Sequence, residues 1–268
     1  MPADGAEMGT VTKALSLLEL FDRHRPLIGL SELARLSGMN KATVHRMLTE
    51  LQAMGYVEQT GTAREYRIGP AVLRLASLRE ATFPTRDVAL PVLRRLADAT
   101  GETAHAALLQ GRRLAMLAYA YSSRHGTRVM MDDAEILPLH ATASGLAVLA
   151  YSGDAFADAV LADPLPRFTA RTVTDPDAIR RTIARVRATG MAEGVGGFES
   201  DVHSYAVPLF DRSADCIGAL AVAAPVARMT DALAAAMRAE LAAAGRELTD
   251  LWGGIAPAGT GQAFSDAG

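Results

Sequence analysis

Three polar side chains at the start of one predicted helix have the types and spacing that nucleic-acid binding needs. The segment Asn40–Arg46 reads NKATVHR, and a helical period puts Lys41, Thr43 and Arg46 in its first two turns, away from an apolar stripe. An arginine can donate two hydrogen bonds to guanine, a threonine can reach a base edge or a phosphate, and a lysine pairs with phosphate. We therefore predict that this helix start enters a major groove of double-stranded DNA.

The stretch around this helix, Ser31–Gly69, has the order of a helix-turn-helix followed by a β-wing. Two short amphipathic helices flank a turn at Gly38, and two short alternating strands flank the polar tip Gln59–Arg64. This arrangement is typical of proteins that place one helix in a DNA groove. The candidate DNA-binding residues are Ser31, Asn40, Lys41, Thr43, His45, Arg46 and Arg64.

Four of these candidates have roles that the pattern defines less closely. Ser31 and Asn40 are expected to cap their helices and to touch backbone oxygens of the DNA as well. Arg64, at the tip of the wing, is expected to contact an adjacent groove or a phosphate. For His45 two interpretations stay open, namely a phosphate contact and simple packing beside Tyr56.

Two other groups of residues contain a nucleophile and a base, and they raise the alternative of an enzyme. They are Cys216 with His203, and Ser144 with His140 and Asp132. Neither group matches a nucleophile motif, and the chain has no Gly-x-Ser-x-Gly, HExxH or phosphate-binding glycine loop. Cys216 begins an apolar strand, which favours a buried, inert thiol, and the histidines lack metal-ligand spacing. We predict no catalytic residue, no metal and no cofactor.

The bulk composition limits the class of protein. With 268 residues, 50% of them hydrophobic, the chain is long enough for about two domains. Its net charge of −3 is shared unevenly, since residues 1–80 hold ten Lys/Arg and nine Asp/Glu, whereas the rest holds seventeen and twenty-one. The single cysteine, the N-terminus without a basic run and the lack of a span of about 18–20 apolar residues predict a cytoplasmic protein that does not enter a membrane.

Caps and turn residues divide the chain into five parts. We expect a disordered tail at 1–9, a winged helix-turn-helix domain at 10–69, a linker helix at 70–84, a larger domain at 85–252 and a disordered tail at 253–268. The larger domain mixes helices and strands without a βαβ rhythm, so we predict an α+β fold with an antiparallel sheet. Its strands are expected near Thr103–Leu109, Arg113–Tyr121, Val129–Met131, Ser204–Phe210 and Cys216–Ala223.

Two blocks of sequence resemble the IclR family of bacterial transcription regulators. The first is Leu15–Gly69, with LSELARLSG, NKATVHRMLTEL and YRIG; the second is PLHATASGLAVLA at Pro138–Ala150, followed by AVPLFD and GALAVAAP. The resemblance implies a winged helix-turn-helix, a linker helix and a GAF-like effector domain with an antiparallel sheet and flanking helices. It also implies dimers or tetramers on palindrome-like operators, with a small molecule that adjusts DNA affinity.

The same resemblance implies where an effector would bind. In relatives that sense glyoxylate or pyruvate, the polar groups of the pocket fall at positions that match Ala143, Ser144, Gly194, Ser204, Ala221 and Ala223. This chain has Gly194 in place of an aspartate, Ser204 in place of a cysteine, and alanines at 221 and 223 in place of two serines. What remains is the helix N-terminus at Ala143–Ser144, which favours an anion.

These departures predict a pocket that is wider and less polar than one for a small oxo-acid. We expect an acid that is larger or less polar than glyoxylate or pyruvate. Gly194–Asp201 is expected to be either a mobile flap over the pocket or a plain surface loop. Two interpretations stay open for four further residues, which are expected to be either pocket walls or plain core: Met116, Tyr119, Met130 and Leu146.

The predicted function is sequence-specific regulation of transcription, as repressor or activator of a catabolic operon. A winged helix that mediates only protein contacts is the remaining alternative, and binding to double-stranded DNA separates the two. The apolar faces of Val11–Phe21 and Ala71–Leu78 are expected to pair between subunits, which makes a homodimer the minimum assembly and leaves a tetramer open.

Overall fold

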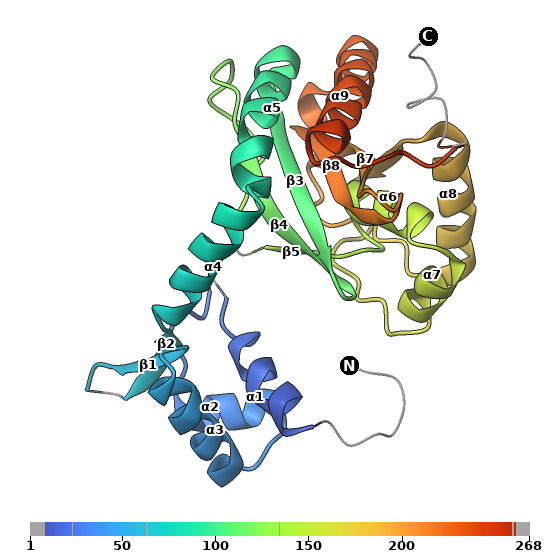
Figure 1. Cartoon of the computed structure of the whole chain (residues 1–268). Coiled ribbons are helices and arrows are strands. Elements are labelled where there is room, and N and C mark those ends of the chain that lie inside the picture. The colour runs from blue at the N-terminus through green and yellow to red at the C-terminus, as the bar shows by residue number, and fades with distance from the viewer. Residues whose placement is uncertain (1–8, 23, 63, 134, 259, 261–268) are drawn as a thin grey trace. The chain divides into compact units, whose positions relative to one another are not determined.

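A winged helix-turn-helix occupies the first of two units, Met1–Pro84, in the computed structural model of the protein (Figure 1). The structure describes residues 9–22, 24–62, 64–133, 135–258 and 260, so the tail expected at 1–9 lies outside the described residues except for Gly9. The elements of the first unit are α1 (Thr10–Leu18), α2 (Leu30–Ser37), α3 (Lys41–Ala53), β1 (Val57–Thr60), β2 (Glu65–Ile68) and α4 (Ala71–Thr82).

Small local features position α3 within this unit. Gly38 takes a φ of 68°, a left-handed conformation that glycine adopts without strain, and it ends α2. The side-chain oxygen of Asn40 then accepts from the N–H of Thr43 at 2.8 Å, so Asn40 caps α3 as predicted. Beneath α3, a core that includes Leu17, Leu33, Val44, Leu48 and Val57 is buried.

Two helix boundaries differ from those expected. The first helix, whose apolar face was expected to extend over Val11–Phe21, ends at Leu18, and beyond it the Asp22 carboxylate accepts from the N–H groups of His24 and Arg25, both at 2.8 Å, and holds a turn there. Ser31 does not cap α2, whose N-cap is Gly29. Ile28 forms a backbone bridge to Tyr66 in β2, and the N-cap follows directly at Gly29, two residues before Ser31.

The second unit, Thr85–Gly268, is built on a six-stranded sheet in the order β5-β4-β3-β8-β7-β6, in which every neighbouring pair is antiparallel (Figure 1). Its strands are β3 (Thr103–Gln110), β4 (Arg113–Ala120), β5 (Ile136–Leu137), β6 (Ala192–Val195), β7 (Val202–Phe210) and β8 (Cys216–Pro225). Its helices are α5 (Thr85–Thr100), α6 (Ala143–Tyr151), α7 (Asp154–Leu161), α8 (Pro176–Thr189) and α9 (Asp231–Leu251), with a short 3-10 turn at Val226–Arg228.

Helices cover both faces of this sheet. One face packs against α5 and α9, and the other packs against α6, on which α7 and α8 lie (Figure 1). Successive side chains of β8 point to opposite faces of the sheet, and both faces are apolar. Leu220 and Val222 join the core under α5 and α9, whereas Ala219 and Ala221 join the core under α6. The predicted α+β class, with helix-turn-helix and antiparallel sheet, is confirmed.

Two further expectations for the second unit are corrected. Val129–Met131 is not a strand, and the short strands β5 and β6 were not predicted. The tail was expected to be disordered from Gly253, but its first residues are hydrogen-bonded to the domain. The N–H of Gly254 donates to the carbonyl of Thr249 at 2.8 Å, and the N–H of Ile255 donates to the carbonyl of Asp211 at 2.9 Å. Residue 259 and residues 261–268 of that tail lie outside the described residues. Among the helices that the structure describes, none is long and apolar enough to cross a membrane.

Candidate functional site

The outer face of α3 carries two positive charges that no described residue pairs with. Lys41 and Arg46 are exposed and Thr43 is half-buried, whereas Val44 and Leu48 on the opposite face are fully buried. Within the described part of the chain, neither Lys41 nor Arg46 has a hydrogen bond or an ion pair through its side chain. Because cations placed this way are open to phosphates and base edges, the face suits DNA contact.

A hollow beside α3 gathers three more of the predicted DNA-binding residues. Ser31 from α2, His45 from α3 and Arg64 from the wing all line it. His45 is exposed there, so its ring is accessible to an external group such as a phosphate. Glu32 and Glu65 also line the hollow, so its two carboxylates outnumber the single arginine of the lining, and the positive charge for DNA contact lies on the adjacent face of α3.

The wing fixes the place of Arg64. Glu58 of β1 lies directly opposite Arg67 of β2, and the two form an ion pair at 2.5 Å. Arg64 has a φ of 52° in the turn at the tip, and its carbonyl accepts from the side-chain amide of Gln59 at 2.8 Å. The charge of Arg67 is thus engaged within the wing, whereas the exposed Arg64 lines the hollow beside α3.

A second candidate site is a cavity in the second unit, between the sheet, the start of α6 and the loop after β6. Its volume is about 50 Å³, which is room for several water molecules. Six of the ten predicted effector-binding residues line it: Ala143, Ser144, Gly194, Ser204, Ala223 and Met130.

The other four predicted residues do not line this cavity: Ala221 is corrected, and for Met116, Tyr119 and Leu146 the structure favours the alternative of plain core over pocket walls. Ala221, Met116 and Leu146 are buried in the core between the sheet and α6, and Tyr119 packs against the same core from β4. Each of them faces the correct side of the sheet or helix. Ala221, Met116 and Leu146 are buried and Tyr119 is partly buried, and none of the four is among the residues that line the cavity.

The start of α6 offers backbone donors to the cavity. Thr142 caps the helix, and its hydroxyl oxygen accepts from the N–H of Gly145 at 3.0 Å. The N–H groups of Ala143 and Ser144 belong to the first turn, where no helical acceptor exists. Gly194 lies so close to this turn that a Cβ there would be 3.0 Å from the nitrogen of Ala143. Strand β6 therefore approaches the helix start because residue 194 has no side chain.

His105 is a polar group in the cavity that the sequence did not reveal. It lines the cavity from β3 and is buried, and its Nε2 lies 3.1 Å from the hydroxyl of Ser144. The other ring nitrogen, Nδ1, is buried without a hydrogen-bonding partner in the part of the protein that the structure describes. Burial lowers the pKa of His105 to about 4, so the ring is neutral at pH 7.

The loop expected as a flap or a plain surface loop forms part of the cavity wall. Gly196, Gly197, Phe198 and Glu199 all line the cavity. The loop is tied to the chain before α8, because the hydroxyls of Thr169 and Thr172 donate to the carbonyls of Gly196 and Gly197, each at 2.6 Å. Glu199 lies at the exposed rim, where partial burial and the nearby carboxylate of Asp201 raise its pKa.

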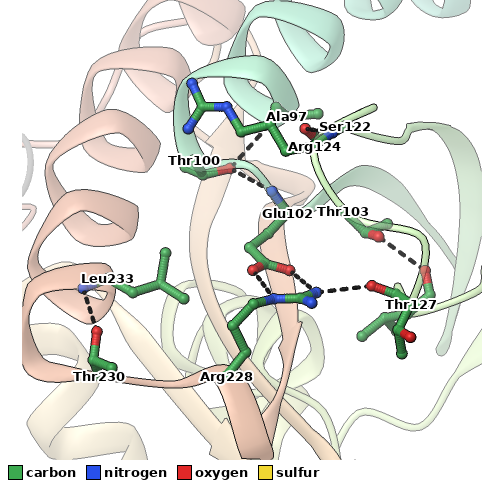
Figure 2. Close-up of polar contacts among 11 residues, drawn as sticks. Ala97, Thr100, Glu102, Thr103, Ser122, Arg124, Thr127, Arg228, Thr230 and Leu233 are labelled. Carbon is green, nitrogen blue, oxygen red and sulfur yellow. Dashed lines mark hydrogen bonds and ion pairs between the residues drawn. The ribbon is translucent and has the colours of Figure 1, made fainter.

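The part of the cavity wall at Val129 is supported by an ion pair next to the start of β3. Figure 2 shows Arg228 bound to both carboxylate oxygens of Glu102, at 2.5 and 2.8 Å, and to the carbonyl of Thr127 at 3.0 Å. Thr103 donates to the carbonyl of Val129 at 2.9 Å. These contacts hold the irregular segment through Thr127–Val129 in place, and Val129 itself lines the cavity.

In both nucleophile–base groups that the sequence suggested, the histidine bonds to a different partner from the expected nucleophile. His203 bonds to Glu193 at 2.8 Å, and His140 bonds to the carbonyl of Pro166 at 2.9 Å. Burial raises the pKa of Cys216 to about 11, which suits an inert thiol.

The hydroxyl of Ser144 has a histidine partner in His105, but the pair lacks the third group that orients a catalytic base, since Nδ1 is unpaired among the described residues. No cluster of three or more His, Cys, Asp or Glu suited to a metal occurs in the described ranges.

Comparison with known proteins matches the regions that contain both sites to models of one family. The description "Bacterial transcriptional regulator IclR C-terminal" matches residues 81–250, and "IclR helix-turn-helix domain" matches residues 10–61. The HTH-type transcriptional regulator XynR of Escherichia coli (strain K12) is 30% identical over 251 residues, which are 90% of this chain and 95% of that protein.

Solved structures agree with this result. A structure from Silicibacter sp. TM1040, assigned to the IclR transcriptional regulators, is 57% identical with a TM-score of 0.91, and the match covers 94% of this chain and 99% of that one. An IclR homolog from Microbacterium hydrocarbonoxydans, solved in complex with 4-hydroxybenzoate, is 27% identical with a TM-score of 0.71, covering 90% of this chain and 100% of that one.

Proposed function

Because this chain belongs to the IclR family of bacterial transcriptional regulators, we propose that α3 and the wing bind a palindrome-like operator and that a small acid in the α6 cavity adjusts this binding. The chain is a DNA-binding transcription regulator with an effector-binding domain, and not an enzyme. The proposal goes beyond the family in three points: the residues that touch DNA, the acid that binds and the genes that respond.

The observation that carries the DNA contacts is the pair of free cations on α3. Lys41 and Arg46 lie on the exposed side of a helix whose other side is buried, directly after the cap at Asn40. Ser31, His45 and Arg64 flank them along the adjacent hollow. We assign phosphate contacts to Lys41, Ser31 and His45, and base contacts to Arg46 and Thr43.

The test is an electrophoretic shift with the DNA upstream of the protein's own gene. Wild type should bind that duplex with an affinity that falls as salt rises, and Arg46→Ala should bind it less tightly. Arg181→Ala is a matched control, because Arg181 is an exposed arginine on α8, in the other unit. A protein that binds no duplex would favour the alternative in which the winged helix makes only protein contacts.

The effector proposed is an acid that is larger or less polar than glyoxylate or pyruvate. The N–H groups at the start of α6 suit its carboxylate, and Val129, Met130, Phe198 and Val202 give the cavity apolar walls. A cavity of about 50 Å³ is small for an aromatic ring, but Met130 is 61% exposed and has room to swing outward. Calorimetry with glyoxylate, pyruvate and a panel of aromatic acids tests this, and tight glyoxylate binding would contradict it.

We also propose a homodimer as the minimum assembly, with a tetramer as its possible extension. Exposed apolar side chains on α1 and α4, among them Val11 and Leu15 on α1 and Leu73 and Leu78 on α4, suit burial against a second copy. Sedimentation at micromolar concentration measures this directly. The site of action is the cytoplasm, where operator DNA lies, and the target is a catabolic operon whose substrate or product is the effector.

A further inference from the structure

We propose that the effector occupies two adjoining spaces, with its carboxylate in the cavity at the start of α6 and an aromatic ring in a second hollow outside that cavity. The ligand class is then an arylalkanoic acid, in which a short unbranched chain joins one carboxylate to the ring. This inference rests on the proposed function, because the carboxylate lies in the same cavity. It adds the place and the shape of the part of the ligand that the cavity does not hold.

The outer hollow adjoins the inner cavity. Its volume is about 510 Å³, against about 50 Å³ for the inner cavity. Five residues line both spaces: Val129, Met130, Phe198, Glu199 and Val202. Since the two spaces share this part of their walls, a ligand that reaches from one into the other passes between these side chains.

The size of the inner cavity limits which part of a ligand it can hold. A cavity that admits benzene in another protein measures about 150 Å³, whereas this one is about 50 Å³, which suits a carboxylate and the first carbons of a chain. An aromatic ring fits the outer hollow instead. With the ring outside, Met130 keeps its position and no wall of the inner cavity has to move.

Phe168 gives the outer hollow an aromatic surface. Its side chain is 42% exposed, and its ring meets the ring of Phe198 edge to face, with 5.0 Å between the centroids. The backbone beneath it is fixed, because the N–H of Phe168 donates to the hydroxyl of Thr172 at 3.0 Å and that hydroxyl donates to the carbonyl of Gly197 at 2.6 Å. A large ring that is held in place and left exposed suits contact with another flat apolar group.

The charges of the outer hollow favour a ring without a second acid group. Glu199 and Asp201 line the hollow with two carboxylates, and Arg128 lines it with one guanidinium, which lies over the ring of Tyr121 at 4.2 Å from the centroid. Because negative charge is in excess, an acid group on the outer end of the ligand would be repelled. The carboxylate of the ligand therefore belongs inside, at the backbone N–H groups of α6.

A series of acids tests the inference on the full-length wild-type protein. Calorimetry would compare benzoate with phenylacetate, 3-phenylpropionate and 4-phenylbutyrate, and each of these three with its ringless partner, namely acetate, propionate or butyrate. At least one of the longer aromatic acids should bind about tenfold more tightly than benzoate and about tenfold more tightly than its ringless partner, because its ring buries apolar area against Phe168.

Variants assign the gain in affinity to the outer hollow. Phe168→Ser should weaken the best longer acid about tenfold, because the apolar surface under the ring is lost. Phe168→Tyr, which keeps the flat surface, should bind that acid within about threefold of wild type. Val173→Ser is the matched control and should also stay within about threefold, because Val173 is exposed in the same segment and lines neither space.

The outcomes separate the two proposals. If benzoate binds as tightly as every longer acid, the ring lies in the inner cavity, which overturns this inference and leaves the acid effector standing. If Phe168→Ser binds the longer acid as tightly as wild type, the ring lies elsewhere and the inference is again overturned. If Phe168→Ser fails to fold, the acid series on wild type still decides the question. If no acid of the series binds wild type, the acid effector itself fails, and this inference fails with it.

Discussion

The carboxylate of Glu102 and the guanidinium of Arg228 form a two-point ion pair in the second unit, with Nε–Oε1 at 2.5 Å and Nη2–Oε2 at 2.8 Å (Figure 2). Glu102 is 2% exposed and directly precedes β3, whereas Arg228 follows the end of β8. Hydrogen bonding to Glu102 raises the pKa of Arg228, so the guanidinium stays charged. The pair links two neighbouring strands to the segment that walls the cavity.

Removing Arg228 should destabilise the protein strongly. In Arg228→Leu the buried carboxylate of Glu102 loses its partner, which we expect to cost about 3 kcal/mol in the free energy of unfolding. Urea unfolding measures this loss. The double variant Glu102→Gln/Arg228→Leu should recover part of it, because an amide carries no charge to bury. Arg181→Ala, which breaks an exposed pair, should change the free energy by less than about 0.5 kcal/mol.

Acid should weaken the fold through His105. Burial holds the pKa of His105 at about 4 in the native state, below the 6.5 of an unperturbed histidine. The unfolded chain therefore takes up a proton as the pH falls below about 6.5, while the native ring stays neutral. The free energy of unfolding is unaffected by this residue above pH 6.5 and decreases by roughly 3 kcal/mol between pH 6.5 and 4.

Urea unfolding at a series of pH values checks this dependence. Carboxylates also titrate in the range, so the informative quantity is the difference between wild type and His105→Phe, which should lose part of the slope. The exposed His125 is the control, and His125→Gln should keep the wild-type slope. Parallel curves for wild type and His105→Phe would contradict the assignment.

The sequence predicted the parts of the fold that depend on local contacts. Asn40 caps α3, and Gly38 ends α2, because each acts on residues within three positions of itself. Ser31 was misassigned as a cap because the start of α2 depends on the bridge between Ile28 and Tyr66, which are far apart in the chain.

The same limit explains why the cavity was predicted only in part. His105 gains its role from Ser144, which lies 39 positions away, and nothing in the local pattern of β3 marks it. Val129–Met131 has the composition of a strand, but Thr103 and Arg228 hold the neighbouring backbone carbonyls with side chains instead of a partner strand. Pairing between distant segments therefore decides which predicted residues reach the cavity.

Cys216 should resist alkylation in the native protein. It is the only cysteine, it is buried, and burial raises its pKa to about 11, so at pH 8 roughly one thiol in a thousand is ionised. We expect iodoacetamide at pH 8 to label the native protein at least about a hundredfold more slowly than the urea-unfolded protein, followed by mass spectrometry. Rapid labelling of the native protein would show an accessible thiolate and reopen the question of a reactive site.

The two cations on α3 should affect DNA binding in different ways. Arg46→Ala should weaken operator binding by about 1–3 kcal/mol and relax the preference at one base pair, because a guanidinium fork reads guanine directly. Lys41→Ala should weaken operator and unrelated duplexes alike and lower the salt dependence by about one phosphate contact. Fluorescence anisotropy over a range of salt concentrations, with single-base operator variants, measures both effects. An Arg46→Ala protein with wild-type affinity and base preference would show that another element reads the operator.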